Sequence, residues 1–150
     1  MVSIDSAFST ELAGHPPIAY IKVDVEGFEP KAIRGAAATL AGQKIKPIMK
    51  VEFAPSRWVK IEDDFRWLSD FLKNNDYVPF FPTAGFVSPI TVDTLIQIYE
   101  SWKGLRYDSW VDALFIPREQ SSQEHIMDAY KRACKIFDQM GQSAPVITNG

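Results

Sequence analysis

Residues 18–34, IAYIKVDVEGFEPKAIR, decide the fold of this chain, because they are typical of a strand, an acidic turn and the start of a helix. The strand, residues 18–25, is short, apolar and β-branched except for Lys22 and Asp24. The turn occupies residues 26–29 and contains a glycine, which lets the backbone bend sharply or approach a ligand closely. This arrangement predicts the first half of a βαβ unit.

The second half of that unit follows directly. Pro30 suits the first turn of a helix, apolar residues recur at helical spacing as far as Leu40, and Gly42 is the expected stop. Residues 47–53 form a second, mostly apolar strand. Two near-continuous apolar strands joined by a helix predict a parallel, covered sheet with a right-handed crossover.

Carboxylates fall where both predicted strands end. Asp24 lies near the carboxyl end of the first strand, Glu26 lies just past it, and Glu52 ends the second strand. Ligands of open α/β sheets bind at this edge, and a carboxylate on an apolar strand needs a partner or a purpose, so Asp24 is expected to be functional. The alternative for Glu26 is that its side chain is exposed to water and has no function. Glu29 is interpreted mainly as a charge that favours the positive end of the helix.

Two lysines accompany these acids. If the strands pair with their ends level, Lys22 lies beside Lys50, one step behind Asp24 and Glu52. The pattern therefore predicts a cluster of two lysines and two carboxylates. The alternative is that the long lysine stems reach water at the edge of the sheet.

Residues 54–58 are predicted to form a loop at the same strand ends. Arg57 and Trp58 in this loop are candidates for contact with a substrate, because loops at strand ends often carry binding residues. The alternative for both is an ordinary surface or packing role.

KVDVEGFEPKAIRGAAATL, followed by PIMKVEF, resembles the signature of the FkbM-type S-adenosylmethionine-dependent methyltransferases. In that family a strand ending in a D-V-E-G-x-E turn leads to a helix with a Gly-Ala pair, and a second strand ends in a glutamate. Ser3-Ile4-Asp5 resembles the family's short aspartate motif. The resemblance extends from residue 3 to about residue 118 and is strongest over residues 18–53. The matching positions are Asp24, Val25, Glu26, Gly27, Glu29, Gly35, Ala36 and Glu52.

The resemblance implies an α/β fold: part of a class I methyltransferase (Rossmann-like) sheet, mixed, with about four strands, flanking helices and an antiparallel last strand. It implies methyl transfer from S-adenosylmethionine to a hydroxyl of a sugar or related small molecule. Asp24 and Glu26 would then be the catalytic proton acceptors and Glu52 a catalytic positioner. Asp24 would also steady the positive charge of the cofactor. No metal site is expected.

One departure from the family is large. Such domains hold the cofactor in a glycine-rich loop after an early strand, and no such run lies upstream of Ile18. The chain is therefore expected to be the C-terminal part of a domain, inactive alone and without measurable S-adenosylmethionine binding in a calorimetric titration. The alternative is a non-catalytic remnant or an assembly module, and a strand with a glycine-rich loop encoded upstream would discriminate between them.

The remaining sequence predicts a domain over residues 1–118, an amphipathic helix over 119–140 and a flexible tail over 141–150. Within the domain we expect, in order, a helix at 61–75, a strand at 77–81 that Pro79 marks as an edge or bulge, a turn-rich loop at 82–89, a helix at 91–103 and a strand at 110–116.

Composition limits the possible functions. The chain has 150 residues, 46% of them hydrophobic, and a net charge of −3, which argues against nucleic-acid binding. Cys134 is the single cysteine, so no internal disulfide is possible. No signal peptide or membrane-length apolar run is visible, and a cytoplasmic location is expected; the alternative is that a targeting segment is missing together with the front half of the domain. The expected partners are a small-molecule or glycan acceptor, and another copy of the chain through the exposed edge of the strand at 18–25.

Overall fold

A computed structural model describes residues 3–10, 16–83, 86–105 and 109–122. The chain divides into two compact units, residues 1–118 and 119–150. The helices and strands described below belong to the first unit. The predicted helix at 119–140 is described only over residues 119–122, which contain the end of a 3₁₀ turn at Arg118–Gln120 and no α-helix; residues 123–150, with the predicted tail, lie outside the described residues.

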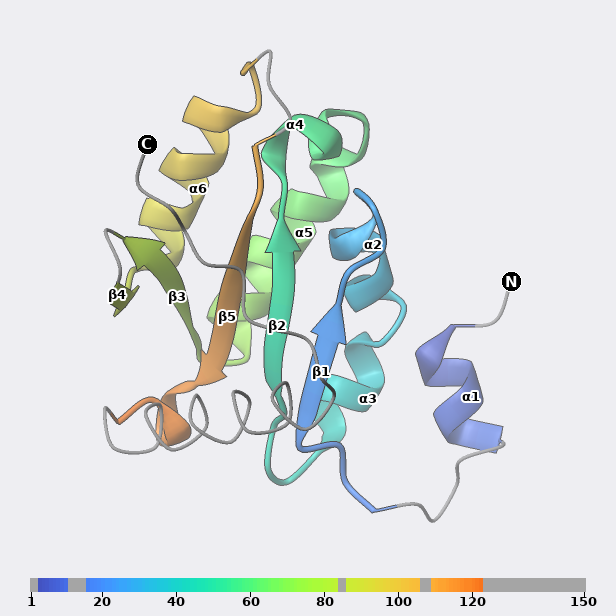
Figure 1. The fold of residues 1–150 in the computed structure, drawn as a ribbon. Helices are drawn as coiled ribbons and strands as arrows, with labels where there is room; N and C mark the ends of the chain where they lie inside the picture. Colours follow the sequence, from blue (N-terminus) through green and yellow to red (C-terminus); the bar gives the residue numbers. More distant parts are fainter. Residues whose placement is uncertain (1–2, 11–15, 84–85, 106–108, 123–150) are drawn as a thin grey trace, which may run out of the picture. The chain divides into compact units, whose positions relative to one another are not determined.

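The described strands form one mixed sheet in the order β1-β2-β5-β3-β4 (Figure 1). β1 and β2 are parallel, whereas β5 pairs antiparallel with both β2 and β3, and β4 pairs antiparallel with β3. The predicted α/β class and antiparallel last strand are confirmed, with five strands in place of about four. The bounds are β1 Tyr20–Val23, β2 Ile48–Phe53, β3 Tyr77–Thr83, β4 Phe86–Pro89 and β5 Val111–Pro117.

β4 is the additional strand, and it lies in the segment predicted to be a loop. Its pairing with β3, in which Phe81 lies opposite Ser88, also places β3 between two strands. Of the two alternatives predicted from Pro79, an edge strand or a bulge, the edge strand is therefore wrong. Proline is tolerated at position 79 because β4 pairs with β3 only from Phe80 onward. Pro79 takes part through its carbonyl oxygen alone, which accepts from Ile90 N at 2.8 Å.

The predicted helices at 61–75 and 91–103 are confirmed as α5 and α6, whereas the helix after the acidic turn is divided in two. The break falls at Gly35-Ala36, and the second piece has its own cap: the Asp5 carboxylate accepts from Ala38 N at 3.1 Å and Thr39 N at 2.7 Å. The family-like aspartate at position 5 therefore has a structural role. The helices are α1 Ile4–Thr10, α2 Glu29–Arg34, α3 Ala37–Gly42, α4 Pro55–Trp58, α5 Glu62–Asn74 and α6 Val92–Trp102, with a 3₁₀ turn at Val59–Ile61.

The core lies between the sheet and the helices that cover one of its faces. Side chains of β2 alternate, so that Met49, Val51 and Phe53 are fully buried in this core. The Phe53 ring packs edge-on against Trp58 at 5.1 Å and against Phe81 at 5.3 Å between ring centroids. The same alternation directs the polar residues of β2 to the opposite face.

β1 ends the described part of the sheet, since it pairs with β2 alone among the described strands. Tyr20, the first residue of β1, is 47% exposed. An edge strand that has a partner on one side only, as β1 has among the described strands, is a template for strand pairing. We therefore expect the chain to associate with a second copy through β1 at tens of micromolar.

Light scattering tests this expectation. The wild-type chain should scatter as a dimer or larger species, and Tyr20→Lys should shift it toward the monomer, because an edge lysine opposes strand pairing. Lys103→Gln, at the residue that follows α6, is the matched surface control. A wild-type chain that stays monomeric at this concentration would contradict the expectation.

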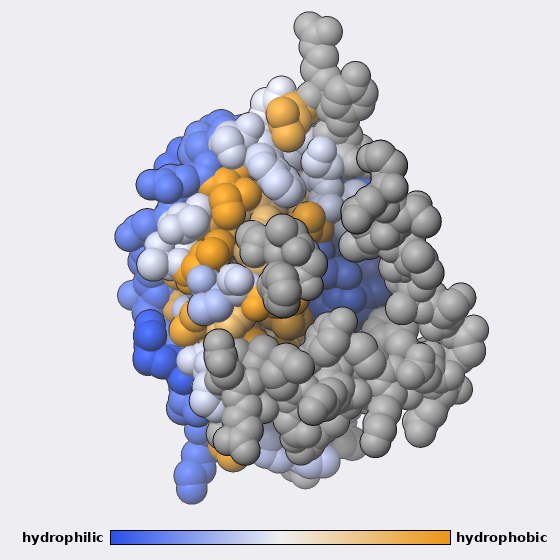
Figure 2. Space-filling model, turned by 60° about the vertical axis from the view of Figure 1, so that its left-hand side comes forward, coloured by the Kyte–Doolittle hydropathy of each residue, from blue (hydrophilic) through white to orange (hydrophobic). Residues whose placement is uncertain are grey.

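Apolar residues also gather on the side of the molecule formed by β3, β4 and α6 (Figure 2). Val87 of β4 contributes to the apolar surface of this part and is 40% exposed. This surface is at the opposite end of the strand order from the acidic turn after β1. In the described residues, none of the helices has the length and apolar character needed to cross a membrane.

Candidate functional site

The acidic turn after β1 is fastened by a buried carboxylate. Glu29 is 0% exposed, and its Oε1 accepts from Val25 N and from Gly27 N, both at 3.0 Å. Its other oxygen, Oε2, accepts from Trp58 Nε1 at 2.7 Å. The interpretation of Glu29 as mainly a favourable helix-end charge is therefore wrong: its side chain holds the turn closed and ties it to α4.

The backbone of the turn is left-handed at two consecutive residues, Glu26 with φ of 54° and Gly27 with φ of 98°. A non-glycine residue in this region is uncommon and costs about 1–3 kcal/mol, which the surrounding contacts must offset. The hydrogen bonds from Val25 and Gly27 to Glu29 supply such contacts. They hold Glu26 in a fixed place beyond the end of β1.

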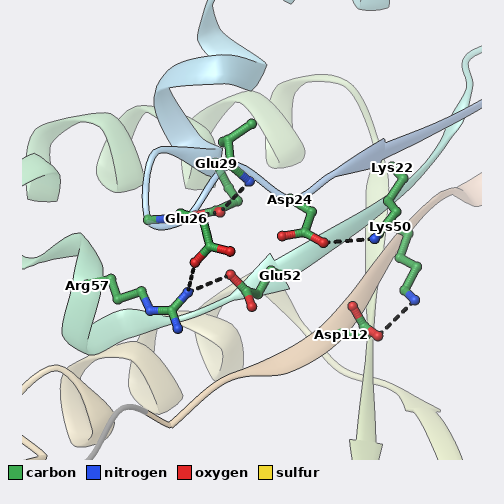
Figure 3. Close-up of polar contacts among 10 residues, drawn as sticks. Lys22, Asp24, Glu26, Glu29, Lys50, Glu52, Arg57 and Asp112 are labelled. Atoms are coloured by element: carbon green, nitrogen blue, oxygen red, sulfur yellow. Dashed lines mark hydrogen bonds and ion pairs between the residues drawn. The ribbon is translucent and has the colours of Figure 1, made fainter. Parts of the chain in front are cut away.

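The three predicted acids lie together at the carboxyl ends of β1 and β2 (Figure 3). The predicted register is confirmed, because Lys22 pairs with Lys50 and Val23 with Val51. The side chains differ in exposure: Asp24 is 40% exposed, Glu26 is 82% exposed and Glu52 is 11% exposed. A ligand at this edge therefore meets two accessible carboxylates and one nearly buried one.

The two lysines take separate partners. Lys22 Nζ lies 2.8 Å from Asp24 Oδ2, and this hydrogen bond raises the pKa of the lysine. Lys50 Nζ lies 2.8 Å from Oδ2 of Asp112, which β5 brings opposite Glu52. Within the predicted cluster, Lys22 and Asp24 form an ion pair, whereas Lys50 pairs with Asp112 and Glu52 pairs with Arg57. Asp112 was not among the predicted site residues, although its place in the predicted last strand is the signal that could have indicated it.

The segment predicted as a loop at 54–58 contains the short helix α4, and its two candidate residues have different surroundings. Arg57 Nη1 lies 3.0 Å from Glu26 Oε2 and 2.9 Å from Glu52 Oε2, so one guanidinium joins acids from two elements. Trp58 is fully buried in the aromatic core. Its predicted contact with substrate does not fit this position, and the packing alternative does.

The Glu52 carboxyl has a perturbed acidity. Burial raises its pKa, Arg57 acts in the opposite direction, and the nearby carboxylates raise the pKa further, so the net shift is upward. The contributing carboxylates are Asp24, Glu29 and Glu26. A carboxyl group held nearer to neutral pH is better matched to proton exchange than an exposed one.

Replacing Glu52 by glutamine is expected to remove a pH dependence of stability. Because the folded-state pKa lies above the ordinary value of 4.5, the folded protein binds this proton more tightly than the unfolded chain. In the wild-type chain, the contribution of Glu52 to the free energy of unfolding is therefore greatest below pH 4.5. This contribution falls as pH rises through the folded-state pKa of Glu52. Glu52→Gln should lose less stability than wild type as pH rises from the ordinary value of 4.5 through the raised folded-state pKa.

Urea unfolding across this pH range measures the difference. Lys60→Gln is the control, because this exposed lysine of the Val59–Ile61 turn is not among the charges that shift the Glu52 pKa, and it should keep the wild-type slope. A Glu52→Gln variant whose free energy of unfolding declines as steeply as that of wild type would show that the folded-state pKa is not raised.

A separate recess of about 660 Å³ lies at the opposite edge of the sheet. It is lined by the start of β3 and the region between β4 and α6, including Tyr77, Pro79 and Thr91. The charged residues of its lining include two ion pairs, Lys73 with Asp93 and Arg118 with Asp76. The lining does not include Asp24, Glu26 or Glu29. In the described residues, no group of three or more His, Cys, Asp or Glu side chains is arranged to hold a metal ion.

A family model of known proteins matches this chain. The family described as Methyltransferase FkbM domain matches residues 1–79, which span the acidic turn, β2, α4 and α5. The match ends before the strand β5, although the sequence resemblance extended to about residue 118. No curated protein and no solved structure matches. Since the match covers more than half of the 150 residues, the chain belongs to the FkbM methyltransferase domain family.

Proposed function

We propose that this chain carries the acidic, acceptor-side part of an S-adenosylmethionine-dependent O-methyltransferase, acting on a hydroxyl of a sugar or related small molecule. The observation that carries the proposal is the gathering of Asp24, Glu26 and Glu52 at the carboxyl ends of two parallel strands. This is the edge at which α/β folds bind ligands. Membership of a methyltransferase family supports the same reaction class.

The acids fit both the charge of the cofactor and the chemistry of the acceptor. S-adenosylmethionine, when bound, supplies a methyl group on a positively charged sulfur. Asp24, 40% exposed, is the proposed contact for this charge, since a nearby carboxylate favours a cation. The 150 residues contain no glycine-rich strand-turn segment, so we propose that cofactor binding also requires such a segment.

The proton of the acceptor has two proposed destinations. As the acceptor oxygen forms its bond to the methyl carbon and the bond from sulfur to that carbon breaks, the hydroxyl proton passes to a carboxylate oxygen of Asp24 or Glu26. Both side chains are accessible, with 40% and 82% exposure. Glu52, held by Arg57, would orient the reacting groups, which is the main contribution a protein makes to such a transfer.

The direct test joins this chain to a glycine-rich cofactor-binding half and supplies S-adenosylmethionine with a ¹³C-labelled methyl group. A panel of monosaccharides and their glycosides serves as acceptors, and the product is read by NMR. We expect a labelled methyl ether, and we expect its loss in the Asp24→Asn/Glu26→Gln double variant. Absence of transfer to every hydroxyl by a folded, cofactor-binding protein would favour the alternative of a non-catalytic assembly module.

A further inference from the structure

Arg57 connects the two halves of the acidic site. Its Nη1 lies within 3.0 Å of one oxygen of Glu26, beyond β1, and within 2.9 Å of one oxygen of Glu52, on β2. The two contacts differ in burial, because the Glu52 side chain is 11% exposed and the Glu26 side chain is 82% exposed. Water screens the contact with Glu26 strongly, so the contact with Glu52 is the stronger of the two.

The turn after β1 fixes the position of Arg57 as well. Gly27 has φ of 98°, and a Cβ added there would lie 2.9 Å from the Cβ of Arg57, closer than such atoms approach. The stem of Arg57 therefore lies directly against the glycine. Glu29 holds the other side of this turn through Gly27 N. The glycine is required for two reasons, its left-handed backbone and the close approach of Arg57.

We propose that Arg57 is a positioning residue, which the Gly27 turn holds in place and which in turn orients the Glu52 carboxylate at the carboxyl end of β2. The inference rests on the proposed function for its catalytic meaning. It differs from the expectation that Arg57 binds substrate, because the guanidinium acts through Glu52. It also gives Gly27 a function beyond the shape of the turn.

Arg57 is placed to orient Glu52 among neighbours that are mostly acidic. Its Nη1 is a cationic donor within hydrogen-bond distance of the Glu52 carboxylate. The other charged groups that face Glu52 are mostly acidic, and the two nearby lysines pair with Asp24 and Asp112. These groups are Lys22 and Asp24 at β1, Glu26 in the turn, Glu29 in α2, Lys50 in β2 and Asp112 in β5.

The test is a carboxyl titration of the 150-residue chain by NMR, with ¹³C-labelled glutamate and with Glu52→Gln to assign the resonance. Arg57→Gln should raise the pKa of Glu52, because the opposing positive charge is lost. Arg57→Lys should raise it less, since the charge stays but the planar geometry does not. Gly27→Ala should also raise it, because the added methyl group displaces Arg57.

The double variant separates a linked effect from two independent ones. If Gly27 acts through Arg57, then Gly27→Ala/Arg57→Gln should give the same Glu52 pKa as Arg57→Gln alone. Lys73→Gln, which breaks an ion pair with Asp93 at the far edge of the sheet, is the control and should leave the Glu52 pKa unchanged. An unchanged Glu52 pKa in Arg57→Gln, or fully additive shifts in the double variant, would overturn the proposal.

Kinetics provide a second readout in the protein that also carries the cofactor-binding half. Arg57→Gln should lower kcat and move the acidic limb of its pH profile to higher pH, with KM for the acceptor unchanged. A rise in KM alone would instead identify Arg57 as a substrate contact and overturn the positioning role. The titration requires neither cofactor nor acceptor, so failure of the proposed methyl transfer would leave its result interpretable.

Discussion

Replacing Asp24 by asparagine should lower the turnover of methyl transfer by about 10²–10⁴-fold, the usual contribution of a positioned proton acceptor. The change keeps the size of the side chain and removes its charge. Stability should change little, because the lost ion pair with Lys22 joins side chains that are 40% and 50% exposed. Exposed pairs of this kind contribute about 0–1 kcal/mol.

Lys22→Gln is the matched control for this experiment. It breaks the same ion pair but keeps the Asp24 carboxylate, so it separates the loss of the pair from the loss of the acid. We expect both variants to unfold at nearly the wild-type urea concentration and only Asp24→Asn to lose most of its kcat. Equal losses of kcat in the two variants, or an unaffected Asp24→Asn enzyme, would remove Asp24 from the catalytic role.

Replacing Glu29 by alanine should destabilise the chain by about 3–5 kcal/mol, since each buried donor that loses its acceptor costs about 1–3 kcal/mol. Two buried donors lose their acceptor, Gly27 N and the indole nitrogen of Trp58, together with the part-buried Val25 N. A loss of this size is a large fraction of the stability of an ordinary domain. If Glu29 only complemented the helix dipole, the cost would be about 0.3–1 kcal/mol.

A double-mutant cycle tests the connection between the turn and α4. Glu29→Gln keeps one acceptor oxygen but replaces the other by an NH2 donor, which would face either the indole N–H or a backbone N–H. Trp58→Phe removes the indole donor. The two changes together should cost less than the sum of their separate effects in urea unfolding. Additive costs would show that the bond from Trp58 to Glu29 contributes nothing specific.

Much of the fold could be predicted because its elements have strong local signals. α5 has a continuous apolar stripe and acidic residues in its first turn, and β2 is a short apolar run, so both were located to within a residue or two. The division of the helix at Gly35-Ala36 could not be predicted, because the cap that begins α3 comes from Asp5, far away in sequence. β4 could not be predicted, because its sequence is rich in turn residues and it forms a strand only through its pairing with β3.

The candidate site shows the same limit. The placement of Asp24 and Glu52 followed from strand register alone, which sequence alternation determines. The role of Glu29 could not be predicted from register, because it depends on Trp58, which is 29 residues away in sequence and packs against the turn. Asp112 became part of the site through the insertion of β5 beside β2, an order of strands that periodicity does not determine.

We propose that cofactor and acceptor meet at the acidic edge formed by β1 and β2. Amide chemical-shift mapping tests this most directly, with S-adenosylhomocysteine added to the ¹⁵N-labelled chain joined to a cofactor-binding half. We expect the largest shifts on the amides of Val25, Glu26 and Gly27 and on the indole N–H of Trp58. Shifts confined to the recess at the opposite edge, around Val78 and Thr91, would contradict it.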